Sequence, residues 1–120
     1  MTWLKVDDGF PTHHKVLSIP RGPRRLAAVG AWTLAGAWVA GNQHDGRVPN
    51  TVLEELAIGP RVVADLVSAG LWSENGSGYM MHDYLDYNPS AEKVEKDRRE
   101  ASERQRRARD AARRKRGEAP

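Results

Sequence analysis

The residues of this chain best suited to binding chemistry are the basic side chains near its C-terminal end. Between Arg104 and Arg116, eight basic residues stand against one acid, Asp110, for a net charge of +7. Guanidinium and ammonium groups at this density favour phosphate groups whatever the base sequence. If about five of the charges neutralise phosphates, log K should fall with log salt at a slope of about −4 to −5. The candidate phosphate contacts are Arg104, Arg106, Arg107, Arg109, Arg113, Arg114, Lys115 and Arg116.

A second group of candidate phosphate contacts surrounds the start of an apolar helix. Arg21, Arg24 and Arg25 fall within five residues, and Lys15 is close in the sequence. Cations at a helix N-terminus oppose the helix dipole, which favours acids there. This mismatch points to phosphate binding, and a solvated turn is the alternative.

A third candidate is the segment Thr51–Ala69, where two short apolar helices are separated by Gly59-Pro60. In a helix-turn-helix, the second helix enters the major groove of DNA. Arg61 is the side chain of that helix able to make two hydrogen bonds to guanine, and Ser68 could contact phosphate. Asp65 would repel phosphate. The alternative is that the two helices only close the core and the domain binds another protein.

The sequence argues against an enzyme or a metalloprotein. It has no cysteine, which excludes disulfides, Cys-ligated zinc, iron–sulfur sites and a Cys nucleophile. The histidines His13, His14, His44 and His82 lack a metal-ligand spacing. His82 is followed by Asp83, but no nucleophile or phosphate loop accompanies them. We therefore expect no catalytic residue, no cofactor and no metal.

Charge divides the chain of 120 residues into two parts. Residues 1–88 hold seven basic and nine acidic residues, a net −2, together with every Trp, Tyr and Phe. Residues 89–120 hold twelve basic and seven acidic residues, a net +5, and Val94 is their only apolar side chain larger than Ala. We expect a folded domain over 1–88 and a charged, C-terminally basic helix or disordered tail over 89–120. No apolar run could span a membrane and no secretory signal is visible, so a soluble cytoplasmic protein is expected.

Hydrophobic periodicity and turn residues predict the elements that position these side chains. Trp3–Val6 is predicted as a strand or extended arm, and His13–Ile19 as a short helix capped by Thr12 and packing Val16, Leu17 and Ile19 inward. Arg24–Ala40 is predicted as the central helix, with Leu26 and Leu34 among its buried residues. Its expected C-terminal stop is Gly41-Asn42, followed by a polar turn over 43–47.

Three further elements complete the predicted domain. Thr51 and Glu54 fit a capping box that starts a third helix, and Pro60 opens a fourth that ends at Gly70. Residues 71–84 then read as a β-hairpin around Asn75-Gly76, in which Trp72 and Tyr79 are expected to be partly exposed. The loop Asn75–Gly78 lacks Arg and Lys, so we interpret it as a plain turn. This order predicts an α+β fold, a winged helix-turn-helix of about four helices with a hairpin wing.

The last part of the chain begins with a helix that Ser90 can cap. Acid-first pairs at four-residue spacing support it: Glu92–Lys96, Glu95–Arg99, Glu100–Arg104 and Glu103–Arg107. Residues 104–116 are expected to be helical only in part. The charged helix lacks the apolar heptads of a coiled coil, so a homodimer is expected to use the winged domain.

Several runs of residues resemble phage-encoded helix-turn-helix proteins of actinobacteria. They are Trp3–Asp7 with Phe10 and His14-Lys15, the Ala/Trp-rich helix, Asp45–Pro49, Leu66–Trp72 and Gly78–Ser90. The pattern, over roughly residues 2–107, is more distantly similar to the N-terminal winged-helix domain of phage replisome organisers and DnaD-like replication initiators. In those relatives a second domain follows that engages DNA or a helicase loader. The resemblance implies a phage protein of replication or gene regulation.

Together the residues and the resemblance predict a non-catalytic DNA-binding protein. The basic tail would contact the phosphates of duplex DNA and the folded domain would position the protein. Two alternatives remain open from the sequence: an adaptor that binds a replication or host protein through the winged domain, and an RNA-binding accessory protein.

Overall fold

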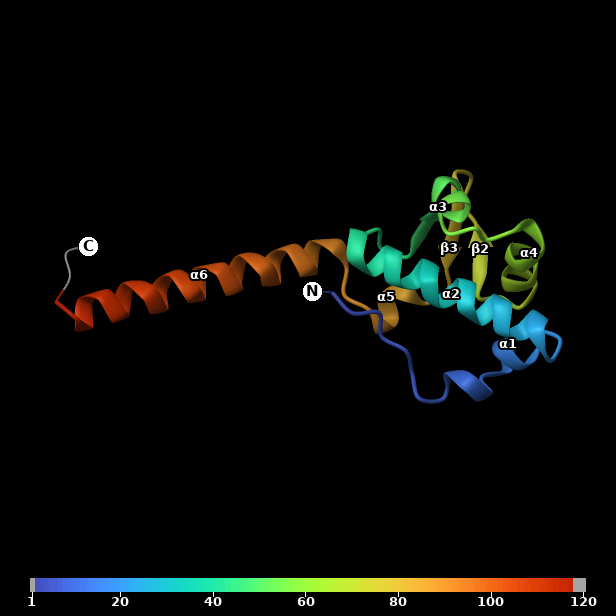
Figure 1. Ribbon diagram of the computed structural model, residues 1–120, viewed down its shortest axis with the longest axis horizontal. Coiled ribbons are helices and arrows are strands. Elements are labelled where there is room, and N and C mark those ends of the chain that lie inside the picture. Colours follow the sequence, from blue (N-terminus) through green and yellow to red (C-terminus); the bar gives the residue numbers. More distant parts are fainter. Residues whose placement is uncertain (1, 118–120) are drawn as a thin grey trace. The chain divides into compact units, whose positions relative to one another are not determined.

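A computed structural model describes residues 2–117 of the chain (Figure 1). The chain divides into two compact units, residues 1–90 and 91–120. The first unit combines helices with a three-stranded antiparallel sheet, so its class is α+β. Its elements are η1 (Phe10–Thr12), α1 (His14–Leu17), α2 (Pro23–Asn42), β1 (Arg47–Pro49), α3 (Asn50–Glu55), α4 (Pro60–Ser68), β2 (Trp72–Glu74), β3 (Gly78–Met81) and α5 (Tyr84–Tyr87).

The sheet has the strand order β1-β3-β2, with β3 in the middle. Val48 of β1 pairs with Tyr79 of β3, and Glu74 of β2 pairs with the same tyrosine from the other side. Gly78 is needed where β1 and β3 meet, because a Cβ there would collide with the backbone of Val48 and Pro49. The hairpin is shorter than predicted, since its second strand ends at Met81.

The third strand is β1 and not Trp3–Val6, which takes the second of its two predicted forms, the extended arm. Residues 2–7 form an extended arm without sheet pairing. The arm is held by a bond from the Lys5 amide to the Asn88 side chain at 2.9 Å and by packing of Leu4 against Gly36. Periodicity could not reveal β1, because three residues ending in proline are too few to show alternation.

The core lies between α2, α4 and the sheet. Its largest fully buried side chains are Trp72, Leu66, Val39 and Val48. Trp72 is only 2% exposed, so its predicted partial exposure is wrong; Tyr79 is half-buried as expected. Trp72 begins β2 directly after the buried Leu71, which places the indole under the helices and not on the outer face of the hairpin.

α2 is the central helix, but one of its faces lies in solvent. A stripe of small residues at three- and four-residue spacing, Ala28, Ala31, Ala35 and Val39, faces the core. Leu26 and Leu34 lie off this stripe and are exposed, against prediction. The helix also continues through the predicted stop at Gly41-Asn42. Its last residue is Asn42, and Gln43 in the left-handed conformation caps it.

The ends of the short helices differ from prediction. α1 is capped by the His13 side chain, which accepts from the Lys15 amide at 3.2 Å, and not by Thr12. The helix ends at Leu17, which is half exposed. The capping box at Thr51 does not form, because α3 starts one residue earlier, directly after Pro49 of β1. α4 begins at Pro60 as predicted.

The second unit contains α6 (Ala91–Lys115), which continues unbroken through the segment predicted to be only partly helical. No Gly or Pro interrupts it, and its alanines and long charged residues have high helix propensity. Arg113, Arg114 and Lys115 in its last turn interact favourably with the helix dipole. Of the four predicted pairs, Glu103–Arg107 forms an ion pair at 3.8 Å; Lys93–Asp97 forms another at 3.0 Å.

Candidate nucleic-acid interface

Arg24 forms an ion pair with a buried acid within the fold. Its Nε donates to Asp65 Oδ2 at 3.0 Å and its Nη2 to Oδ1 at 2.8 Å, a two-point pair. Asp65 lies on α4 and is 7% exposed, whereas Arg24 lies in the first turn of α2. The pair therefore ties the start of α2 to α4.

This pair also sets the ionisation of Asp65. The hydrogen bonds from Arg24 hold the pKa of the Asp65 carboxyl below its ordinary value of 3.8, while burial works in the opposite direction. The positive charges of Arg24 and then Arg61 lower the pKa further. Asp65 is thus an ionised, satisfied group that faces α2, not an exposed charge on the outer side of α4.

Arg25 is likewise structural. Its Nε donates to the Ile19 carbonyl and its Nη2 to the Leu17 carbonyl, both at 2.9 Å. These carbonyls lie at and just beyond the end of α1, where a helix leaves acceptors without partners. These hydrogen bonds and the ion pair to Asp65 explain why Arg24 and Arg25 stand at the start of α2, where the helix dipole disfavours cations. Arg21 is exposed in the turn before the helix.

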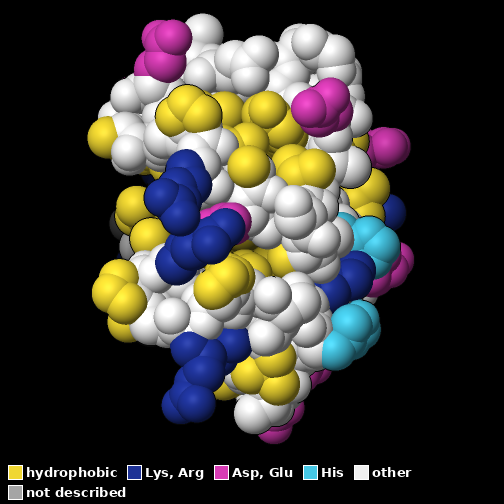
Figure 2. Space-filling model, turned by 90° about the vertical axis from the view of Figure 1, so that its right-hand side faces the viewer, with side chains coloured by type: hydrophobic (Ala, Val, Ile, Leu, Met, Phe, Trp, Pro, Cys, Tyr) yellow, Lys and Arg dark blue, Asp and Glu magenta, His cyan; other side chains and the backbone are white. Residues whose placement is uncertain are grey.

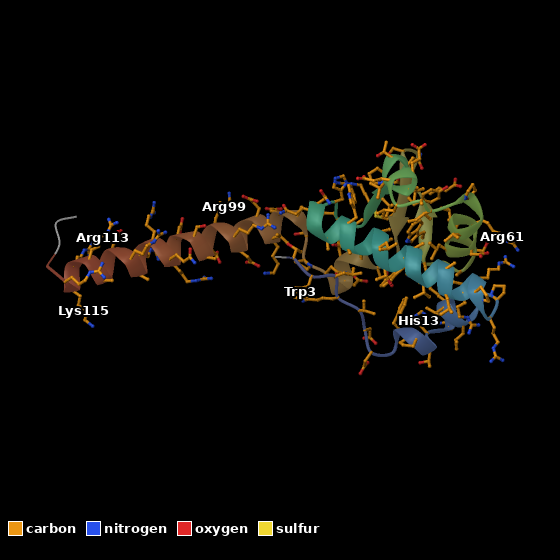
Figure 3. All side chains as sticks on the ribbon, in the orientation of Figure 1. Trp3, His13, Arg61, Arg99, Arg113 and Lys115 are labelled. Atoms are coloured by element: carbon orange, nitrogen blue, oxygen red, sulfur yellow. The ribbon has the colours of Figure 1, made fainter. Side chains whose placement is uncertain are left out.

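The outer side of α4 carries few charges. Arg61, Ala64 and Ser68 are its exposed residues at three- and four-residue spacing. Figure 3 labels Arg61 at the outer end of the first unit, pointing away from the core. Figure 2 views that end and shows several Lys and Arg side chains where α1, α4 and the start of α2 meet. Arg61 and Ser68 are exposed, and their contact with DNA stays a prediction.

A groove of about 600 Å³ runs between α3, α4 and the hairpin. Apolar residues such as Leu53, Ile58 and Val63 line it, together with the acids Glu54 and Glu74. Both acids are exposed, and the loop after Glu74 carries no basic side chain. The surface beside the outer face of α4 is therefore apolar and acidic, a poor match for phosphate.

α6 presents the densest exposed positive charge in the described part of the chain. Every residue from Glu95 to Lys115 is exposed. The structure places all the predicted tail contacts on this helix except Arg116, which follows it directly. They are Arg104, Arg106, Arg107, Arg109, Arg113, Arg114 and Lys115.

The four histidines make several different contacts. His13 and His14 stack on each other at 4.4 Å, His44 packs edge-on against Trp38, and His82 Nε2 lies 2.9 Å from Asp83. Within residues 2–117, no group of three or more His, Asp and Glu is arranged to hold a metal ion.

Sequence reasoning missed the Arg24–Asp65 pair, although two signals pointed to it. Asp65 stands next to Leu66 on the apolar side of its helix, where an unpaired acid would be costly. Arg24 stands where the helix dipole disfavours it. Each anomaly explains the other once the two helices are packed together.

Comparison of the chain with protein-family models, with curated proteins and with solved structures gives no match. None of the helices formed by residues 2–117 is both long and apolar enough to span a membrane.

Proposed function

We propose that this chain is a non-catalytic DNA-binding protein built on a winged helix-turn-helix. The order of helix, strand, two helices and hairpin, with the sheet order β1-β3-β2, supports that fold. The compact pair α3 and α4, separated by four residues, supports the helix-turn-helix within it.

One observation carries the functional proposal: an exposed helix of 25 residues that ends in a dense run of arginines. Phosphate contacts by such residues supply affinity without sequence readout. The first unit adds little positive charge of its own, because Arg24 and Arg25 are bound internally. In this proposal α6 binds phosphates, and Arg61, Ser68 and Arg21 add local contacts from the folded domain.

The resemblance to phage helix-turn-helix proteins supports a role in phage replication initiation or phage gene regulation, in the cytoplasm of a bacterial host. Neighbouring genes separate the two roles. A helicase or its loader beside this gene favours replication, and an integrase favours regulation.

The proposal is tested by measuring the binding of duplex DNA, single-stranded DNA and duplex RNA at two salt concentrations. The full chain is compared with a chain ending at Ser90, which keeps the first compact unit. We expect the shortened chain to lose most of its duplex affinity and salt dependence. Equal binding by both chains would overturn the role of α6, and preference for RNA would replace DNA as the partner.

The groove beside α4 favours a second candidate function, a protein–protein adaptor. Its apolar lining and its acids Glu54 and Glu74 suit a basic segment of another protein better than phosphate. Capture of one dominant host or phage protein after nuclease treatment, lost in the Glu54→Lys/Glu74→Lys variant, would support it. Loss of every captured protein on nuclease treatment would count against it.

A further inference from the structure

We propose that α6 binds the phosphates of duplex DNA through one face only, an arginine stripe made of Arg99, Arg106, Arg109 and Arg113. This inference rests on the proposed function and specifies how it is achieved. The basic residues on the other faces of the helix would point away from the duplex and contribute little to affinity.

Helix geometry defines the stripe. Successive side chains are rotated by about 100°, so residues three, four and seven apart share a face. From residue 98 to 116, one arc of about 100° holds seven positions. They are Arg98, Arg99, Ser102, Arg106, Arg109, Arg113 and Arg116. This face therefore contains six arginines, one serine and no acid.

The other faces of the same stretch are mixed. The acids Glu100, Glu103 and Asp110 all fall outside the arc. Glu103 is ion-paired with Arg107, which also lies outside it. Between residues 98 and 116 the carboxylates therefore lie on these faces, with Glu103 and Asp110 next to the edge of the stripe. Glu95, which precedes this stretch, lies on the same face as Arg99.

The length of the stripe and the regular spacing of its charges favour a duplex as the ligand. From Arg99 to Arg113 the stripe is about 21 Å long, because the helix rises 1.5 Å per residue. That length matches about six base pairs along a duplex axis at 3.4 Å each. Figure 3 shows Arg99 and Arg113 on one side of the helix, with Lys115 on the other. A straight row of charges suits the regular phosphate array of a duplex better than a flexible single strand.

The test compares two full-length triple variants that remove the same charge. The stripe variant is Arg106→Gln/Arg109→Gln/Arg113→Gln. The matched control is Arg104→Gln/Arg107→Gln/Arg114→Gln, whose positions all lie outside the arc. Glutamine preserves helix propensity, and circular dichroism checks that both variants keep the helical content of the parent chain.

Affinity is measured by fluorescence anisotropy with a duplex DNA of about six to twelve base pairs, over a series of salt concentrations. We expect the stripe variant to bind about 100-fold more weakly at 0.1 M salt and its log–log salt slope to flatten by about 2 to 3. The control variant should bind within about threefold of the parent chain, with its slope changed by less than about 1.

The outcomes separate this inference from the proposed function. Equal weakening of both variants would overturn the one-face arrangement and leave DNA binding by α6 intact. A parent chain that fails to bind duplex DNA would overturn both. A duplex RNA of the same sequence is the second arm; tighter binding to RNA, lost only in the stripe variant, would keep the stripe and overturn DNA as its ligand.

Discussion

Arginine does different work in the two units of this protein. At the start of α2, Arg24 and Arg25 are bonded to a buried carboxylate and to helix-end carbonyls. Along α6, arginines are exposed from end to end. An arginine thus joins helices where carboxylates or carbonyls of the fold lie within reach. On an exposed helix with few such acceptors, an arginine is accessible to a ligand. A basic cluster in a sequence indicates a binding site only after its internal partners have been found.

The largest effect that would test this contrast is on stability. Arg24→Ala should lower the thermal midpoint by many degrees, because it leaves the Asp65 carboxylate buried without its partner. Differential scanning fluorimetry measures the midpoint. Arg109→Ala on α6 is the control and should leave the midpoint unchanged while weakening DNA binding. An unchanged midpoint in Arg24→Ala would show that the pair contributes nothing to stability.

The stability difference between the parent chain and Arg24→Ala should depend on pH. The pKa of Asp65 is lower in the folded chain than its ordinary value of 3.8, so the unfolded chain takes up the proton first as pH falls. The stability from the pair is therefore complete well above pH 3.8 and lost as pH falls below it. Thermal midpoints of both proteins from pH 7 to pH 3 should converge at the acid end. A constant difference would contradict this ionisation.

Arg25→Ala should have a smaller effect on stability. It removes two charge-assisted hydrogen bonds from carbonyls near the end of α1, a loss of about 1 to 2 kcal/mol since water can replace part of the contact. Urea denaturation gives the value, and Arg25→Lys should restore only part of it. A variant as stable as the parent chain would return Arg25 to the candidate ligand contacts.

The smallest effect on the fold is expected for Arg61→Ala. The side chain is exposed at the outer end of α4, so stability should change by less than about 0.5 kcal/mol. If α4 reads bases, the variant should bind with relaxed sequence preference in a footprint or a random-sequence selection. An unchanged preference would place sequence readout elsewhere.

Elements with strong local signals were predictable. Pro60 opens α4 and Gly70, with positive φ, follows it, because the first residue suits a helix start and the second a left-handed stop. The Asn75-Gly76 turn and the arginine-rich segment of α6 were equally predictable from the sequence. β1 was missed because its three residues become a strand only through pairing with β3.

The C-terminal part of the chain shows the same contrast between local signals and structural context. Residues 104–116 were predicted to be helical only in part because of their like charges. The alanines among them and the favourable last turn keep the helix continuous as far as Lys115. Homodimerisation through the first unit stays a prediction, with the exposed Leu26 and Leu34 of α2 as the apolar side chains available to it.

Residue order alone establishes where charge and apolar side chains are concentrated along the chain. The acidic balance of residues 1–88, the arginines of α6 and their stripe all follow from residue order and helical period. Which of these charges are bound within the fold depends on how its helices pack. Arg24 and Asp65 are 41 positions apart, and their pairing depends on how α2 packs on α4. Local sequence sets which charged side chains a segment has. Contacts between distant segments decide which of those side chains remain accessible to a ligand.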